Sequence, residues 1–134
     1  MKKTFTIIIS ILSLYACQST SQKTADSTTE KNKAPVYERL SVAQFQNKLA
    51  TLPSYQLVDV RTPEEYDAGK IGEAINLNFY DDNFKTEIAK LKKEEPVLVY
   101  CKAGGRSKKA ADIMVELGFK EIYELEKGYS SWEQ

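Results

Sequence analysis

Cys101 closes an apolar segment and is followed directly by a short loop that contains two glycines and an arginine. Glycine can adopt backbone conformations in which successive N–H groups turn inward, and such a loop before a helix forms an anion-binding nest. The helix adds roughly half a positive charge at its start. This environment favours a cysteine thiolate over the thiol, so Cys101 is the candidate catalytic residue. The candidate substrate-binding residues around it are Lys102, Ala103, Gly104, Gly105, Arg106 and Ser107.

A thiolate in such a loop favours chemistry at sulfur. Thiolates attack a sulfur atom in an exchange reaction that breaks a bond to that sulfur. The N–H groups that stabilise the thiolate would also stabilise a persulfide, in which a second sulfur is bound to Cys101. The alternative is an inert cysteine in a buried strand, a common state for free cysteines. The glycines, the arginine and the helix start that follow Cys101 favour the reactive interpretation.

The spacing from cysteine to arginine separates two classes of cysteine enzyme. Protein phosphatases that act through cysteine place one more residue between Cys and Arg than this chain does, around a phosphate group. Here four residues separate Cys101 from Arg106. The shorter loop forms a smaller cradle, and it holds no acidic residue to protonate an alkoxide leaving group. The loop therefore favours sulfur transfer over phosphoryl transfer.

The composition excludes several other functions. The chain has 134 residues and 0 histidines, so a Ser-His-Asp triad, a Cys-His pair and a His-ligated metal are all excluded. Its 2 cysteines form no Cys-x-x-Cys pair, and we expect neither a metal nor a cofactor. The 19 basic and 19 acidic side chains give a formal net charge of +0, which supplies no electrostatic argument for binding nucleic acid.

The N-terminus has the features of a secretion signal. A basic head at 1–3 precedes an apolar run at 4–16 that is too short for a bilayer span of about 20 residues. The run ends in Leu-Tyr-Ala-Cys17, which resembles the lipobox where bacterial lipoproteins receive a diacylglyceryl group. An ordinary secretion signal with a chance cysteine is the alternative. We expect 1–16 to be removed and Cys17 to anchor the chain to a membrane of the bacterial cell envelope, outside the cytoplasm, on the periplasmic side.

Residues 17–36 separate this signal from the folded part. They are rich in Ser, Thr, Lys and Gln and contain few apolar side chains. Such a segment cannot bury enough apolar surface to offset the entropy lost on ordering, so we interpret it as a flexible polar tether. The length of the remainder, 37–134, fits one domain.

The folded part alternates strand-like and helix-like segments, which must position the loop. Short apolar runs predict strands at 56–60, 74–77, 96–101 and 122–125. Capping-box patterns at Ser41 and Thr62 predict two helix starts, and further helices are expected at 84–91, from about 107 to 117, and near Trp132. This alternation predicts an α/β fold with a parallel sheet. Ligands of such sheets bind at the carboxyl ends of strands, where Cys101 lies.

Five stretches of the folded part resemble the rhodanese family in their order and spacing. They are 57–61 (Leu-Val-Asp-Val-Arg), 62–66 (Thr-Pro-Glu-Glu-Tyr), 69–76 (Gly-Lys-Ile-Gly-Glu-Ala-Ile-Asn), the loop 101–107, and 125–132 (Leu-Glu-Lys-Gly-Tyr-Ser-Ser-Trp). The resemblance implies a mostly parallel five-stranded sheet with helices on both faces and a catalytic persulfide on Cys101.

It also implies that Asp59 and Arg61 form a charge pair that orders the loops near Cys101. A strand-terminal salt bridge without that role is the alternative. Trp132 is expected in the core, with the mouth of the site as its alternative position.

The resemblance implies a sulfurtransferase. The expected reaction moves sulfur from a small anionic donor such as thiosulfate to Cys101, and then to a thiol or to cyanide. Two alternatives stay open: a sulfur carrier or binding module that is loaded by an envelope protein partner without turnover, and a thiol sensor at the cell envelope. A turnover assay with thiosulfate and cyanide distinguishes them.

Overall fold

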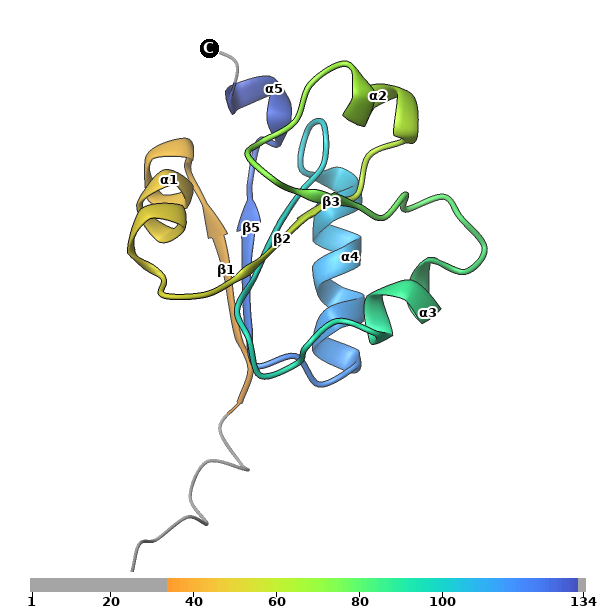
Figure 1. The fold of residues 1–134 in the computed structure, drawn as a ribbon. Helices are drawn as coiled ribbons and strands as arrows, with labels where there is room; N and C mark the ends of the chain where they lie inside the picture. Colours follow the sequence, from red (N-terminus) through yellow and green to blue (C-terminus); the bar gives the residue numbers. More distant parts are fainter. Residues whose placement is uncertain (1–33, 133–134) are drawn as a thin grey trace, which may run out of the picture. The chain divides into compact units, whose positions relative to one another are not determined.

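The computed structural model describes residues 34–132, which form one sheet with helices packed on it. The strands are β1 (Val36–Leu40), β2 (Gln56–Asp59), β3 (Ile75–Asn76), β4 (Val97–Tyr100) and β5 (Glu121–Leu125). Their order across the sheet is β1-β5-β4-β2-β3, and every neighbouring pair is parallel (Figure 1). The predicted α/β fold is confirmed, and the described sheet is parallel throughout.

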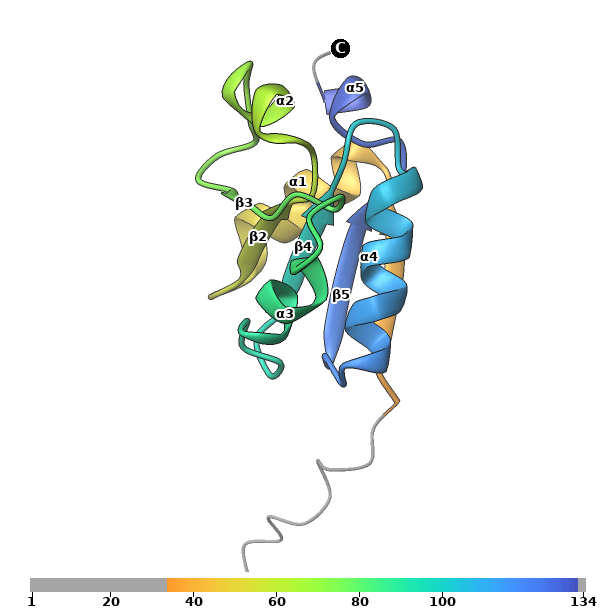
Figure 2. The same cartoon turned by 90° about the vertical axis from the view of Figure 1, so that its right-hand side faces the viewer.

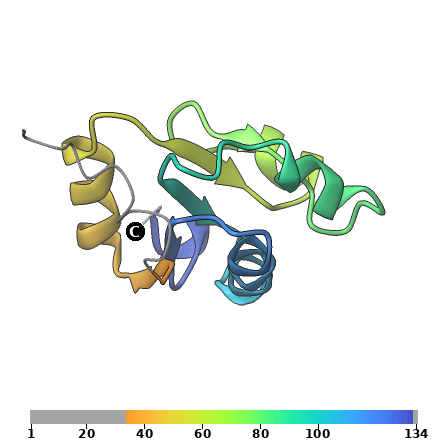
Figure 3. The same ribbon diagram turned by 90° about the horizontal axis from the view of Figure 1, so that it is seen from below.

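The helices cover both faces of the sheet. They are α1 (Val42–Thr51), α2 (Pro63–Asp67), α3 (Phe84–Ala89), α4 (Gly105–Glu116) and α5 (Tyr129–Trp132). Helices α3 and α4 pack on one face and α1 packs on the other (Figures 2 and 3). Helices α2 and α5 lie beyond the carboxyl ends of the strands (Figure 1). The fold thus encloses the carboxyl end of the central strand β4, where Cys101 follows.

Strand β4 is buried on both faces, because it lies between β5 and β2 and under both helix layers. Successive side chains of a strand point to opposite faces. Val97 and Val99 therefore join the core beneath α3 and α4, whereas Leu98 and Tyr100 join the core beneath α1. Cys101 continues this alternation on the α4 side, which directs its sulfur toward the start of that helix.

Local sequence signals explain where the first two helices begin. Ser41 caps α1, and Gln44 closes the capping box from within the helix. Thr62 caps α2 in the same way, with Glu65 as its partner and Pro63 at the first helical position. Both predicted capping boxes are confirmed, because side-chain oxygens there accept the N–H groups that a helix start leaves without an intrahelical partner.

Two differences from the predicted strands and helices bear on the site. An additional strand, β1, starts at Val36, inside the segment that we interpreted as a tether. Its side chains lack a continuous apolar run, and pairing with β5 holds it in the sheet. Helix α4 begins at Gly105, two residues before the predicted start at 107. Gly104 adopts a left-handed conformation (φ 88°) that ends the loop there, so Arg106 lies in the first helical turn and not in the loop.

The proposed signal at 1–16, the lipidation site Cys17 and the tether up to residue 33 lie outside the described residues. Within 34–132 no helix has both the length and the apolar character needed to cross a membrane.

Candidate active site

The sulfur of Cys101 lies in a buried position just beyond the end of β4. The residue is 1% exposed, and the core beneath α4 surrounds it. Strands β5 and β2 flank β4, so the loops that follow these three strands lie around Cys101. Cys101 is a free cysteine in the structure.

Hydrogen bonds from the loop and from the start of α4 act on the sulfur. Gly104 donates its N–H to Sγ at 3.1 Å, and the hydroxyl of Ser107 lies 3.4 Å from Sγ. Burial by itself would raise the pKa of the Cys101 thiol. The hydroxyl of Ser107 and the N–H groups of Ser107, Ala103 and Gly104 outweigh it, and the pKa is lowered from its ordinary value. The direction of this shift is the one that a reactive cysteine requires.

The segment after β5 holds the active loop in place. The N–H of Tyr129 donates to the carbonyl of Cys101 at 2.7 Å, and the N–H of Ser130 donates to the carbonyl of Lys102 at 3.0 Å. Gly128, with φ 62°, passes so close to the loop backbone that a Cβ there would overlap the carbonyl oxygen of Cys101. The loop therefore depends on the C-terminal segment for its shape.

Arg106 binds Glu65 in a bidentate ion pair. Its two terminal nitrogens lie 2.7 and 2.9 Å from the two carboxylate oxygens of Glu65, on α2. The guanidinium of Arg106 lowers the pKa of the Glu65 carboxyl to about 2. The pair joins α4 to α2 across the carboxyl ends of β4 and β2, and it leaves less of the charge of Arg106 available to an incoming anion.

Asp59 and Arg61 form a buried ion pair beside the loop. Both nitrogens Nε and Nη2 of Arg61 bond to the carboxylate of Asp59, at distances from 2.6 to 3.0 Å. Arg61 also donates to the carbonyl of Gly69 at 2.6 Å, and its guanidinium lies 4.0 Å from the ring centroid of Tyr129. Since Tyr129 holds the carbonyl of Cys101, these are the contacts that a loop-ordering role requires.

We expect Asp59→Ala to destabilise the domain by about 3 to 5 kcal/mol, because the charge of Arg61 would remain buried without its partner. The side chains of Asp59 and Arg61 are 0% and 4% exposed. The free energy of unfolding in urea measures the effect. The exposed pair of Lys85 and Glu116 supplies the control, and Glu116→Ala should leave that free energy nearly unchanged. Equal stability of Asp59→Ala and wild type would contradict the prediction.

A small pocket of about 190 Å³ lies beside the active loop. Its lining combines two cationic side chains, one carboxylate and hydroxyl groups. The lining residues are Arg61, Glu65, Ala68, Lys102, Tyr129 and Ser130. Such a pocket suits a small ion. Lys102, a predicted substrate-binding residue, is part of its wall. Within the described residues, no group of three or more His, Cys, Asp or Glu side chains could hold a metal ion.

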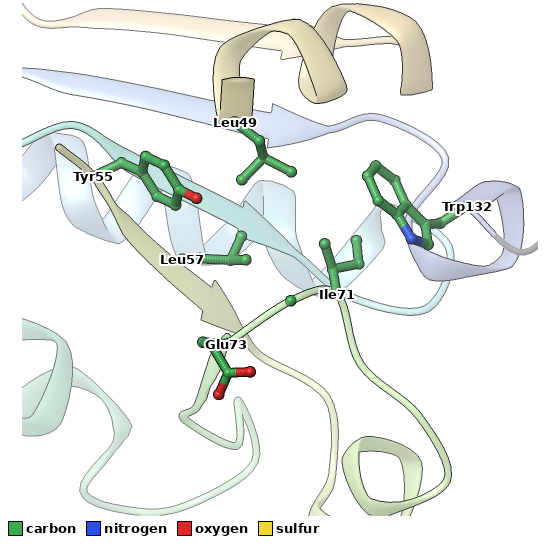
Figure 4. A pocket seen from close by; sticks show the side chains of 7 residues that line it. Leu49, Tyr55, Leu57, Ile71, Glu73 and Trp132 are labelled. Carbon is green, nitrogen blue, oxygen red and sulfur yellow. The ribbon is translucent and has the colours of Figure 1, made fainter. Parts of the chain in front are cut away.

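Trp132 packs against the core but is not fully buried in it. It is half-buried at the margin of the core beneath α1, where its ring meets the ring of Phe45 edge-on at 6.3 Å. It also lines a larger pocket together with Leu49, Leu57 and Ile71, as Figure 4 shows. This pocket shares no lining residue with the pocket beside the active loop.

Two carboxylates of the site were missed by sequence reasoning. Glu65 lies three residues after Thr62, where the sequence pattern indicates only a capping box, and its ion pair with Arg106 spans 41 positions of the sequence. Glu124 was included in an apolar strand, yet it is fully buried and its carboxylate accepts the hydroxyl of Ser107 at 2.8 Å. A charged residue in the middle of a buried strand was the available signal, because such residues are rarely buried without partners.

The parallel α/β fold and the cysteine loop together point to one family of proteins, and comparison with known families identifies it. The rhodanese-like domain family matches residues 41–134. The chain belongs to the rhodanese-like domain family.

Relatives support the same assignment. The thiosulfate sulfurtransferase GlpE of Shewanella oneidensis is 33% identical over 98 residues, which cover 73% of this chain and 94% of that protein. The thiosulfate sulfurtransferase GlpE of Coxiella burnetii is 40% identical over 76 residues, which cover 57% of this chain and 69% of that protein. Among solved structures, a rhodanese-related protein from Thermoplasma volcanium superposes with a TM-score of 0.63 at 27% identity, over 72% of this chain and 91% of that one. The family therefore includes sulfurtransferases.

Proposed function

We propose that this chain is a sulfurtransferase that carries sulfur as a persulfide on Cys101. The observation that carries the proposal is the position of Cys101: its sulfur is buried at the end of β4 and accepts the N–H of Gly104 at 3.1 Å. A thiolate held in this way is a nucleophile toward sulfur. The relatives named thiosulfate sulfurtransferase support thiosulfate as a donor.

The reaction has two steps, and neither requires a cofactor. In the first, the Cys101 thiolate attacks the outer sulfur of thiosulfate. A bond forms between the two sulfurs, the sulfur–sulfur bond of thiosulfate breaks, and sulfite leaves with the electron pair. In the second, cyanide or an acceptor thiolate attacks the outer sulfur of the persulfide, and the thiolate of Cys101 leaves. The N–H groups around Sγ suit both states, because each carries a negative charge on sulfur.

The test treats the purified protein with thiosulfate and records its mass and the product formed with cyanide. We expect the gain of one sulfur atom, its loss after reduction, and thiocyanate in repeated turnovers. Loading without turnover would favour a sulfur carrier that serves a protein partner, and the absence of loading would favour a thiol sensor. Release of phosphate from an aryl phosphate that depends on Cys101, without sulfur transfer, would overturn the proposal.

We expect Arg106→Ala to lower kcat/KM for thiosulfate by roughly tenfold at low ionic strength, and Lys102→Ala to lower it less. Arginine presents a fixed fork of donors to an anion, whereas lysine is a flexible point charge. Salt should weaken both effects. Glu65→Gln makes the opposite change, because it leaves Arg106 in place but removes the carboxylate that binds it, so kcat/KM for thiosulfate should not fall. Equal activity of Arg106→Ala and wild type at low salt would refute a role in donor binding.

We further propose that Cys17 carries a lipid and that the domain works outside the cytoplasm, at the bacterial cell envelope. The support is the sequence of the N-terminus, a basic head and a short apolar run that ends in Leu-Tyr-Ala-Cys17. The Cys17→Ser protein should lose the acyl mass and should no longer partition into detergent. A wild-type protein that retains Met1 and is found in the cytoplasm would exclude this anchor.

A further inference from the structure

Glu124 is a fully buried carboxylate, one strand away from Cys101. Its oxygen Oε2 accepts the hydroxyl of Tyr37 at 2.8 Å and Nε of Arg39 at 2.7 Å, both from β1. Its oxygen Oε1 accepts the hydroxyl of Ser107 at 2.8 Å, from α4. Arg39, Tyr37 and Ser107 thus give the buried carboxylate a cationic partner and two hydroxyl donors, which is the pairing that a buried charged group requires.

The hydroxyl of Ser107 therefore lies between two acceptors. Its oxygen is 2.8 Å from Oε1 of Glu124 and 3.4 Å from Sγ of Cys101. A serine hydroxyl has one hydrogen, so it cannot fully serve both. The carboxylate oxygen is the nearer acceptor, and hydrogen bonds to carboxylates are among the stronger ones. When the thiolate forms, the sulfur must compete with Glu124 for this hydrogen.

We propose that Glu124 is a positioning residue that controls how readily Cys101 gives up its proton, because it competes with the sulfur for the hydroxyl hydrogen of Ser107. The proposal rests on the proposed role of Cys101 as the nucleophile. The consequence is that the Cys101 thiolate is stabilised less and stays more nucleophilic. A thiolate that is stabilised too strongly is a weaker nucleophile, and the best attacking thiol ionises near the ambient pH. Glu124 would offset part of the stabilisation supplied by the N–H groups of the loop.

Other charged groups surround this cluster. Arg106 is bound to Glu65, and Arg61 is bound to Asp59. Burial, followed by the carboxylate of Glu124, raises the pKa of the Tyr37 hydroxyl, so Tyr37 stays a donor to Glu124. Glu126 follows β5 beside Gly104 and pairs with Arg39 at 3.6 Å. Other charged groups near the loop and on the first turns of α4 are Lys102, Lys108, Lys109 and Asp112. The variants below leave all of these side chains unchanged except Tyr37.

The test is Glu124→Gln, with the pH dependence of Cys101 alkylation as readout. The amide oxygen of glutamine can accept from Arg39 and Tyr37 as the carboxylate does, and the amide N–H can donate to the hydroxyl oxygen of Ser107. The hydrogen of Ser107 would then turn to the sulfur. We expect the midpoint for alkylation by iodoacetamide to fall by roughly 0.5 to 1 pH unit. Mass spectrometry of the peptide that contains Cys101 keeps Cys17 out of the measurement.

Three further variants make the outcome specific. Ser107→Ala should raise the midpoint, and Glu124→Gln should shift it less in the Ser107→Ala background, because part of its effect passes through the hydroxyl. Tyr37→Phe removes one donor from Glu124 with little change of shape, so the carboxylate should hold Ser107 more tightly and the midpoint should rise. Glu121→Gln, at the other end of β5, is the control and should leave the midpoint unchanged.

An unchanged or raised midpoint in folded Glu124→Gln would overturn the proposal. If Glu124→Gln does not fold, Tyr37→Phe decides, and a midpoint at or below the wild-type value there would overturn it as well. Alkylation does not require sulfur transfer. A protein that fails to turn over thiosulfate, yet shows these shifts, would contradict the proposed function and leave the role of Glu124 intact.

Discussion

The Cys101→Ser variant is expected to lose sulfur transfer from thiosulfate by more than about a thousandfold. A serine hydroxyl is almost entirely protonated at neutral pH and does not attack sulfur as a thiolate does. The substitution exchanges one atom in a position that is 1% exposed, so the fold and the N–H groups of the loop should persist. A persulfide cannot form on serine, and the mass of the protein should stay constant after treatment with thiosulfate.

Cys17→Ser is the matched control for this experiment. Cys17 is the other cysteine of the chain, so a variant that lacks it should load sulfur and turn over like wild type once it is purified. Stability in urea should be similar for both variants, which separates chemistry from folding. Sulfur loading that survives in Cys101→Ser, or that vanishes in Cys17→Ser, would place the reactive sulfur elsewhere and refute the assignment.

Much of this site could be predicted from the sequence because its central part is local. The strand before Cys101, the glycine at position 104 and the helix that follows are contiguous, and each follows from residue type and hydrophobic pattern. The capping boxes at Ser41 and Thr62 are local in the same sense, since each needs only a partner three residues away. These were the elements on which the prediction agreed with the structure.

The long-range contacts around the site could not be predicted in this way. The hydroxyl of Tyr37 meets Glu124 across 87 positions of the sequence, and Ser107 meets Glu124 across 17. Such contacts depend on the strand order, in which β1 lies beside β5. Strand β1 itself was missed, because its burial pattern is mostly exposed or intermediate and carries no continuous apolar run. Its place in the sheet comes from pairing, which no local pattern specifies.

The two neighbouring glycines of the loop looked equivalent in sequence, and the structure separates them. Gly104 has φ 88°, and a Cβ there would overlap the carbonyl oxygen of Glu126. Gly105 is the first residue of α4, is not among the glycines with positive φ, and has open space where a Cβ would be placed. Only Gly104 therefore needs to be glycine, although both were expected to shape the nest.

Gly104→Ala should lose most of the sulfur transfer, whereas Gly105→Ala should stay close to wild type. A side chain at 104 costs about 1 to 3 kcal/mol for the left-handed backbone alone, and the overlap with Glu126 forces the loop to move. That movement withdraws the N–H that Gly104 donates to Sγ of Cys101. Alanine at 105 fits the helix and should stabilise the domain by about 0.4 to 1 kcal/mol.

Measurements of kcat/KM for thiosulfate and of unfolding in urea test both variants. Full activity in Gly104→Ala would show that the N–H at this position does not support the chemistry, and an inactive Gly105→Ala would show that the second glycine has a role its open surroundings do not explain.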